Sequence, residues 1–228
     1  MLDSADALGR RIPDQFLLTN DLTNEEVHRA LTDISDSLRS LANDAVALDG
    51  PSILQMADID SFSRVLTIAA KDVARFANPL NLAEDVVEQI IAKVIGEPYL
   101  VKDWAGEMDD MYTGQVVLNG RNVRTSFLLK GAGLKGPLKP KYLGHNGDQI
   151  TRMTTQPAEL FVVQHVGRVE PSVRKQLQDA VLARRAEGNH TAVGTVWDGV
   201  DVARLGVAYG FLDPSTGVLR ADALDKDS

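Results

Sequence analysis

Residues 107–131 read EMDDMYTGQVVLNGRNVRTSFLLKG, and this stretch decides the fold that we expect. Two runs rich in apolar and β-branched residues flank Asn119-Gly120, a dipeptide that strongly favours a two-residue hairpin turn. A tight antiparallel hairpin brings its two outer ends together. Asp110, before the first strand of this hairpin, and Lys130, at the end of its second strand, should therefore meet at the open end of a sheet.

Hydrophobic periodicity extends this hairpin into an α/β core with a mixed β-sheet flanked by helices, behind an N-terminal helical region. We place the domain boundary near residue 80, with the helical region over residues 1–80 and the core over residues 81–228. The pattern predicts helices over residues 27–49, 52–76, 82–95, 148–153, 170–186 and 198–209, and strands over residues 99–104, 112–118, 123–129, 159–166 and 191–197.

The composition is that of a globular protein without a disulfide or a thiolate metal site. Hydrophobic residues make up 44% and charged residues 25% of the 228 residues, and there is no cysteine. The four histidines show no paired metal-ligand spacing. No apolar run approaches the roughly 20 residues that a membrane helix needs, and the N-terminus lacks the apolar segment of a secretory signal. We therefore expect a cytoplasmic protein with no membrane partner.

The charge of the chain is unevenly distributed. The net charge is -8, yet residues 111–147 contain no Asp or Glu. A basic stretch of this kind favours binding to a polyanion such as nucleic acid, and a solvated loop with a chance excess of cations is the alternative. The six basic side chains of the stretch are Arg121, Arg124, Lys130, Lys135, Lys139 and Lys141.

Carboxylates beside a lysine at the end of a sheet suit phosphodiester hydrolysis. Carboxylate oxygens hold a divalent ion such as Mg²⁺ (or Mn²⁺), which lowers the pKa of a bound water and neutralises phosphate charge. A neighbouring lysine orients the attacking water or stabilises the charge that develops on the phosphorane. Simpler structural roles stay open, since Asp110 suits a turn and Lys130 suits a strand end whose ammonium reaches water.

These residues and the order of elements resemble the PD-(D/E)XK restriction-endonuclease-like superfamily. The resemblance rests on a helix, three strands, a helix and a strand, with Asp110 before the second strand and FLLK at Phe127–Lys130. It covers roughly residues 82–166. It implies that Asp110 is a metal ligand and Lys130 the catalytic lysine. Gln149 and Glu84 resemble the helix glutamine and the helix acid of branches of the superfamily.

One position departs from the superfamily pattern. Leu128 stands two residues before the lysine, where the superfamily carries Asp or Glu. Glu107 is the first substitute ligand by its proximity to Asp110 in the sequence, and Glu84 is the second. As alternatives, Glu84 suits a first-turn helix acid and Gln149 a polar residue at a helix start.

The expected function is that of a metal-dependent endonuclease. Asp110, Lys130, Glu107 and Gln149 are the expected catalytic residues, and Asp110, Glu107 and Glu84 the expected metal ligands. DNA is expected rather than RNA as the partner, with phosphate contacts from Arg121, Arg124, Lys135, Lys139 and Lys141. The alternative, motivated by Leu128, is a catalytically inactive protein of the same fold that binds nucleic acid or scaffolds an assembly. The N-terminal helices either pack on the core or form a homodimer.

Overall fold

The computed structural model describes residues 23–98, 110–145 and 147–224. The chain divides into two compact units, residues 1–46 and residues 47–228. Most of the first unit that is described belongs to one helix, α2 (Asn24–Asp49). A reciprocal capping box opens it, because Glu26 N donates to Thr23 Oγ1 at 3.3 Å and Thr23 N donates to Glu26 Oε2 at 2.9 Å. The helix predicted to end near residue 49 is confirmed.

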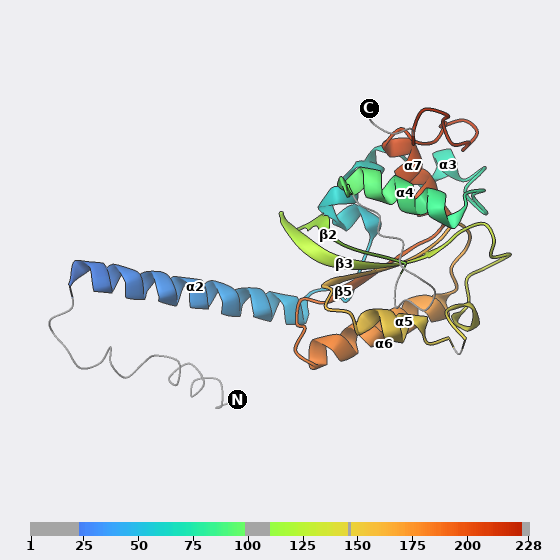
Figure 1. Cartoon of the computed structure of the whole chain (residues 1–228). Helices are drawn as coiled ribbons and strands as arrows, with labels where there is room; N and C mark the ends of the chain where they lie inside the picture. The colour runs from blue at the N-terminus through green and yellow to red at the C-terminus, as the bar shows by residue number, and fades with distance from the viewer. Residues whose placement is uncertain (1–22, 99–109, 146, 225–228) are drawn as a thin grey trace. The chain divides into compact units, whose positions relative to one another are not determined.

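The described residues of the second unit form a five-stranded mixed sheet in the order β1-β5-β4-β3-β2. Strands β1, β5, β4 and β3 are parallel, and β2 is antiparallel to β3 (Figure 1). The strands are β1 (Ile53–Leu54), β2 (Met111–Leu118), β3 (Arg121–Lys130), β4 (Leu160–His165) and β5 (Val193–Trp197). The α/β class with a mixed sheet flanked by helices is therefore confirmed.

The turn between β2 and β3 has the geometry that the sequence predicts. Asn119 and Gly120 both have positive φ, 53° and 74°, as a type I′ turn requires. Gly120 N also donates to Asp60 Oδ2 at 2.7 Å, which ties the turn to the segment that precedes the hairpin in the chain. The hairpin register is therefore fixed both locally and by tertiary contact.

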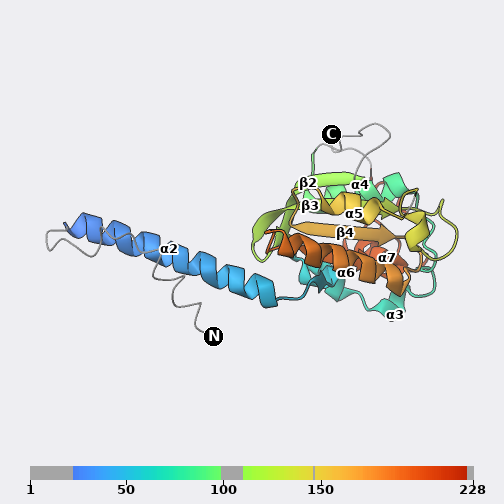
Figure 2. The same ribbon diagram turned by 90° about the horizontal axis from the view of Figure 1, so that it is seen from below.

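Helices cover both faces of the sheet (Figures 1 and 2). One face carries α3 (Ala70–Val73), α4 (Glu84–Ile95) and α7 (Gly199–Ala208), and the other carries α5 (Gln149–Thr154) and α6 (Pro171–Ala186). The alternation of β3 serves both layers, because Phe127 and Leu129 join the core on the α4 side and Leu128 joins the core on the α5 side. No described helix has the length and hydropathy to cross a membrane.

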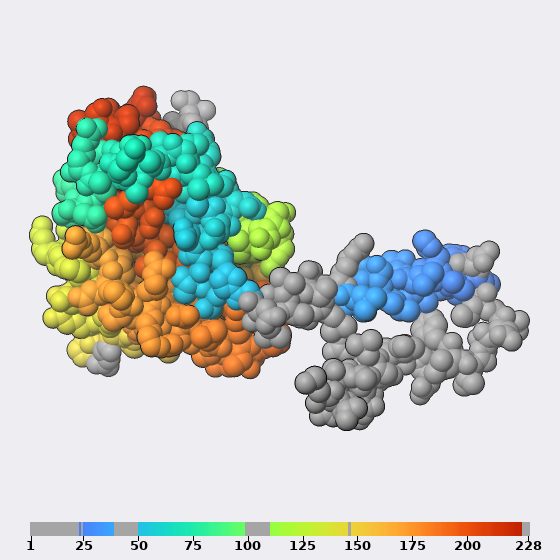
Figure 3. Space-filling model, turned by 180° about the vertical axis from the view of Figure 1, so that it is seen from behind, coloured from blue at the N-terminus to red at the C-terminus, as the bar shows by residue number. Residues whose placement is uncertain are grey.

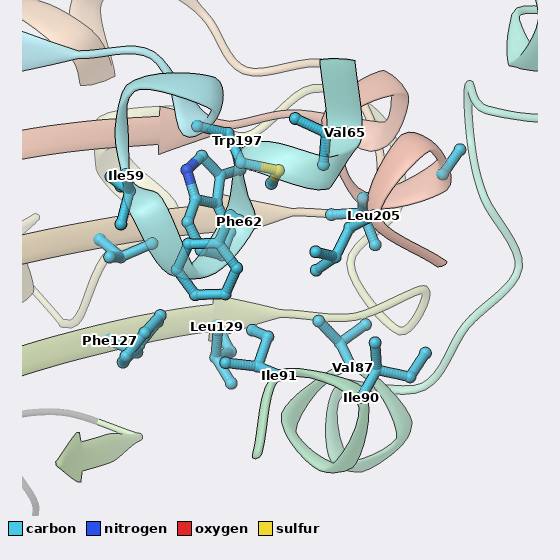
Figure 4. Packing of buried hydrophobic residues seen from close by; sticks show 14 of the residues in the cluster. Ile59, Phe62, Val65, Val87, Ile90, Ile91, Phe127, Leu129, Trp197 and Leu205 are labelled. Atoms are coloured by element: carbon cyan, nitrogen blue, oxygen red, sulfur yellow. The ribbon is translucent and has the colours of Figure 1, made fainter. Parts of the chain in front are cut away.

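An aromatic cluster fills the core on the α4 side (Figure 4). Trp197, at the end of β5, packs edge-on against Phe62 at a centroid distance of 4.9 Å and against Phe127 at 5.9 Å. The Trp197 indole donates to Thr195 Oγ1 at 3.0 Å, so its polar atom is satisfied although the residue is fully buried. This cluster joins β3 and β5 to the segment before α4.

The single helix predicted over residues 52–76 is wrong. The segment contains β1, two 3₁₀ helices (Met56–Asp58 and Asp60–Thr67) and the short α3. Ile59, Phe62 and Val65 are fully buried at a spacing of three, which is the period of a 3₁₀ helix and is easily taken for an α-helical face. Leu66, assigned to that face from sequence, is 69% exposed.

Residues 47–80 are part of the second compact unit (Figure 3). Main-chain pairing of β1 with β5 brings it into the sheet. Arg185 of α6 also holds it, since its guanidinium donates to Gly50 O at 2.9 Å, to Pro51 O at 3.0 Å and to Ala192 O at 2.7 Å. The boundary that we placed near residue 80 therefore lies inside this unit, and the division falls at residues 46–47 instead.

The remaining elements follow the predicted order. The helices α4, α5, α6 and α7 and the strands β2 to β5 match predicted segments to within a few residues. Asp198 caps α7 through hydrogen bonds from Val200 N at 2.8 Å and Asp201 N at 3.2 Å, as its sequence position predicts. The strand predicted over residues 99–104 lies outside the described residues.

Candidate functional site

Lys130 lies where three elements of the second unit converge. It is the last residue of β3, and its ammonium Nζ lies 3.4 Å from Asp110 Oδ2 and 3.9 Å from Glu84 Oε2. Asp110 directly precedes β2, and Glu84 is the first residue of α4. The side chain of Lys130 is 19% exposed, so the ammonium sits in a partly buried position between two carboxylates. We call Glu84, Asp110 and Lys130 the carboxylate–lysine cluster.

The hairpin register places Asp110 in this cluster. Met111 pairs with Phe127, so the same register sets Asp110 opposite Leu128. Asp110 N donates to Phe127 O at 2.9 Å, and Asp110 Oδ2 accepts from Leu129 N at 2.6 Å. These bonds orient the carboxylate toward the end of β3. The predicted approach of Asp110 to Lys130 at the open end of the sheet is therefore confirmed as geometry.

Glu84 reaches the cluster because α4 begins against the chain that follows β3. Ala132 N donates to Leu82 O at 2.8 Å, and the Gly131 N–H acts on the Glu84 carboxyl in the direction that lowers its pKa. A β-carbon at Gly131 would collide with the main-chain nitrogen of Glu84, so glycine is what permits this close approach. The Ala132–Leu82 hydrogen bond and the close packing at Gly131 thus hold the start of α4 beside the end of β3.

The pKa of Glu84 is raised above its ordinary value. Burial is the main cause; the Asp110 charge adds to it, while the Lys130 ammonium and the Gly131 N–H act in the opposite direction. A cation arriving beside Glu84 would favour the ionised form of this carboxyl.

Two polar residues at the end of β4 support the backbone of Lys130. Gln164 is fully buried, and its amide oxygen accepts either from Lys130 N at 3.3 Å or, with the amide turned over, from Val166 N at 3.1 Å and His165 N at 3.2 Å. The His165 ring lies between Lys130 O and Gly136 O, with Nδ1 and Nε2 each 3.1 Å from their partners. No spacing signal in the sequence pointed to His165.

Leu128 occupies the position where the resemblance would place an acid. It is fully buried in the apolar core on the α5 side, together with residues such as Leu138, Ile150, Phe161 and Val163. This position lies opposite Asp110 in the hairpin, and its side chain offers no oxygen atom to a metal ion. Any ligand beyond Asp110 must come from another element.

The donor set of the cluster fits a water-rich magnesium site. Mg²⁺ is commonly held by one or two carboxylates, with water completing its octahedral shell. Asp110 and Glu84 supply two carboxylates, each within 4.0 Å of the same ammonium. Within the described ranges there is no group of three or more His, Cys, Asp or Glu side chains suited to a metal. Glu107, the third predicted ligand, lies outside the described residues.

Gln149 lies apart from the cluster in the hydrogen-bond network. It begins α5, on the opposite face of the sheet from α4, and its main-chain nitrogen donates to Leu143 O at 2.9 Å. In the part of the chain that the structure describes, no hydrogen bond joins its side chain to Asp110, Lys130 or Glu84. The catalytic role predicted for Gln149 stays a prediction without a supporting contact.

The predicted nucleic-acid residues fall into two groups, one at the hairpin end of β3 and one in the connection that follows β3. Arg121 and Arg124 lie at the hairpin end, and six residues of extended strand, about 20 Å, separate Arg124 from Lys130. Arg121 is bound to Glu159 by an ion pair of 2.6 Å. These two arginines therefore do not flank the carboxylate–lysine cluster.

The second group lies in the connection that leaves Lys130. Lys135 and Lys141 are exposed, and Lys139 is paired with Glu170 at 3.2 Å. Lys141 also lies over the Tyr142 ring, 5.0 Å from its centroid. The connection stays attached to the end of β4, since Leu138 N donates to Arg168 O at 2.8 Å. The basic side chains of this connection thus follow the cluster directly in the chain.

Comparison with known proteins supplies no relative for this chain: no family model, no curated protein and no solved structure matches it. The fold and the geometry of the cluster are consequently what bears on function.

The raised pKa of Glu84 predicts a pH-dependent stability. Because the folded-state pKa exceeds the unfolded value, the folded state binds more protons in the window between them, and the free energy of unfolding falls as pH rises through that window. We expect Glu84→Gln to remove this loss, so its stability relative to wild type should increase from pH 4 to pH 8. The side chain is 46% exposed, so solvent screening keeps the gain below about 1 kcal/mol. Urea denaturation at a series of pH values measures it, and a relative stability that falls with pH would contradict the assignment.

Proposed function

We propose that residues 47–228 form a metal-dependent endonuclease of the PD-(D/E)XK type that hydrolyses phosphodiester bonds, in DNA rather than in RNA. The observation that carries the proposal is the approach of Asp110 Oδ2 and Glu84 Oε2 to Lys130 Nζ, at 3.4 Å and 3.9 Å. The three side chains come from a helix start, a strand entry and a strand end. Tertiary folding alone brings Glu84 to the hairpin, 26 residues before Asp110 in the sequence.

The order of elements supports this proposal. Helix α4 precedes the antiparallel pair β2 and β3, and α5 then leads to β4, which is parallel to β3. The resemblance stated from sequence implies a helix, three strands, a helix and a strand, with the acid before the second strand and the lysine at the end of the third. The first expected strand, residues 99–104, lies outside the described residues, and the order of the described elements is compatible with the rest of this arrangement.

The proposed chemistry assigns a separate role to each member of the cluster. Asp110 and Glu84 would hold Mg²⁺ or Mn²⁺, with Glu107 as the further predicted ligand. When bound, such an ion supplies a water of lowered pKa and neutralises phosphate charge. The Lys130 ammonium donates to an oxygen of the scissile phosphate or to the attacking water, and so stabilises the charge that builds up in the transition state. The Leu129 N–H, which donates to Asp110 Oδ2 at 2.6 Å, keeps this carboxylate in place.

The proposed nucleic-acid contacts centre on the connection after β3. Lys135 and Lys141 are exposed and lie within eleven residues of Lys130 in the chain, so they are suited to flanking phosphates. Lys139 would have to exchange its Glu170 partner for a phosphate. Arg124 and Arg121 lie about 20 Å and about 30 Å from Lys130 along β3, a distance that spans several base pairs of duplex, and would contact more distant phosphates. The cytoplasmic location expected from composition stays a prediction.

Leu128 favours a second candidate function. With an apolar side chain at the usual acid position, the same fold could bind nucleic acid or scaffold an assembly without cutting it. The two candidates differ in their dependence on metal. Binding that persists in EDTA with no cleavage in Mg²⁺ or Mn²⁺ supports the inactive protein, and cleavage that EDTA stops supports the enzyme.

The test uses purified full-length protein with four labelled substrates: single- and double-stranded DNA and single- and double-stranded RNA. Each is incubated with Mg²⁺, with Mn²⁺ and with EDTA, and the products are separated on denaturing gels. We expect metal-dependent cleavage of at least one DNA substrate. If none of the four substrates is cut with either metal, the enzymatic proposal fails and the binding measurement decides the second candidate.

A further inference from the structure

Helix α2 carries an apolar face whose side chains are exposed. Val27 is 40% exposed, Leu31 61%, Ile34 50% and Leu38 53%, all within the part of the helix whose side chains are described. Isolated helices are marginally stable in water, and most of their stability in proteins comes from packing of an apolar face. We therefore expect this helix of 26 residues to pack its apolar face against a partner.

The spacing of the face identifies the kind of partner. The four residues are separated by four, three and four positions, and Leu41, Ala45 and Leu48 continue the alternation in the sequence. This is the seven-residue repeat that places apolar residues at positions a and d. Between Val27 and Leu41 every large apolar side chain lies at one of these positions. A helix that packs on a globular core shows a wider stripe, whereas a narrow a/d stripe is the seam of a coiled coil. The pattern thus fits another helix of the same repeat.

The charges of α2 lie mostly away from this seam. The positions that flank it in the middle of the helix are small and uncharged, namely Ala30, Ser35, Ser37 and Ala42, whereas Asp44 and Asp49 flank it near the C-terminal end. Two such helices can approach closely in the middle, and acidic residues of the two copies face each other across the seam only near that end. Glu25, Glu26, Asp33 and Asp36 lie on the outer positions instead, and outnumber the basic residues there. An acidic outer face does not suit an anionic lipid surface or nucleic acid.

We propose that α2 binds a second copy of itself, so that the chain forms a dimer through a two-helix coiled coil. Identical faces can form an isologous interface, in which each copy contributes the same apolar seam to the contact. Burying seven apolar positions on each helix, at roughly 60–120 Å² per side chain, removes on the order of 1,000 Å² from water. That is the lower end of the range for specific interfaces. We therefore expect an association that depends on protein concentration.

This inference stands independently of the proposed nuclease activity. Where that activity holds, the dimer would carry two carboxylate–lysine clusters, which suits the cutting of both strands of a duplex. The dimer itself requires only the seam.

The test compares full-length wild type with Leu31→Gln/Leu38→Gln in sedimentation equilibrium, from sub-micromolar to about 200 µM. Glutamine has nearly the helix propensity of leucine, so the variant loses the apolar seam and keeps the tendency to form the helix. Thr32→Gln/Asp33→Gln, on the outer face, is the matched control. We expect a dimer for wild type and for the control, and at least a tenfold weaker association for the seam variant.

Three results would overturn the proposal. These are a wild-type monomer over the whole concentration range, a dimer that the seam variant leaves intact, and an association that the outer-face control weakens as much as the seam variant does. A circular dichroism spectrum and a thermal melt of each variant show whether residues 47–228 remain folded. Because that unit lacks the substituted positions, we expect its melting transition to be unchanged.

Discussion

Lys130→Met should reduce metal-dependent cleavage by about 100-fold or more, since removal of one preorganised donor to a transition-state charge typically costs that much. Methionine keeps most of the length of the side chain and removes the ammonium. The structure gives that ammonium a specific position, 3.4 Å from Asp110 and 3.9 Å from Glu84. No other basic side chain is paired with either carboxylate among the described residues. A neighbouring lysine is therefore not expected to replace it.

The matched control for this prediction is Lys135→Met, which removes an exposed ammonium from the connection that follows the cluster. Loss of the Lys135 ammonium should slightly reduce the affinity for nucleic acid and the dependence of that affinity on salt concentration. It should have little effect on the cleavage rate at saturating substrate. Folding is checked separately by urea denaturation of both variants. Lys130→Met leaves two carboxylates without their cation, so we expect a stability loss of about 1 kcal/mol or less. Cleavage by Lys130→Met at the wild-type rate would remove Lys130 from the mechanism.

The hairpin shows which parts of the site the sequence could predict. Asn119-Gly120 specified the turn, and the turn fixed the register that brings Asp110 to Lys130. This relation is local, because it requires only strand alternation and a two-residue turn. The prediction reached the right geometry for these two residues without knowledge of the rest of the fold.

The contact of Glu84 with the cluster depends on tertiary structure that the sequence does not reveal. A helical projection can place Glu84 on the flank of the apolar stripe, but it cannot say what lies beside the helix start. The decisive element is Gly131, whose missing side chain lets α4 approach the end of β3. Glycine is common in the turns and loops that follow strands, so a single sequence gives no sign that this one marks a close approach. For the same reason His165 was not recognised, because its two carbonyl partners come from separate segments.

The N-terminal part of the second unit shows a different limit. Strand β1 has only two residues, and neither is fully buried, so periodicity could not identify it. Its place in the sheet follows from main-chain pairing with β5 and from the two hydrogen bonds that Arg185 donates to Gly50 O and Pro51 O. The apolar period of three that follows β1 is shared by α and 3₁₀ helices over so short a length. Local pattern alone therefore assigned the segment to the wrong element and the wrong unit.

Leu128→Glu should destabilise the protein by several kcal/mol and should not create a better metal site. The substitution installs the acid that the superfamily carries two residues before the lysine. In this chain the position is fully buried in an apolar core, where a carboxylate would have no hydrogen-bond partner or counter-charge. Burial of an unpaired charge is among the few causes of losses above about 4 kcal/mol. With total stabilities of roughly 5–15 kcal/mol, the variant should be largely unfolded or insoluble.

Two controls separate burial of charge from the remaining effects of the substitution. Leu182→Glu makes the same change at a leucine of α6 that is 46% exposed, and we expect a change within about 0.5 kcal/mol. Leu128→Met keeps the volume and polarity of the buried side chain, and it should cost less than about 1.5 kcal/mol. Urea denaturation of the three variants gives the comparison. A folded Leu128→Glu protein with faster Mg²⁺-dependent cleavage would show instead that this position can turn toward the metal. Asp110, which lies opposite it in the hairpin, would then share the ion with it as the superfamily pattern implies.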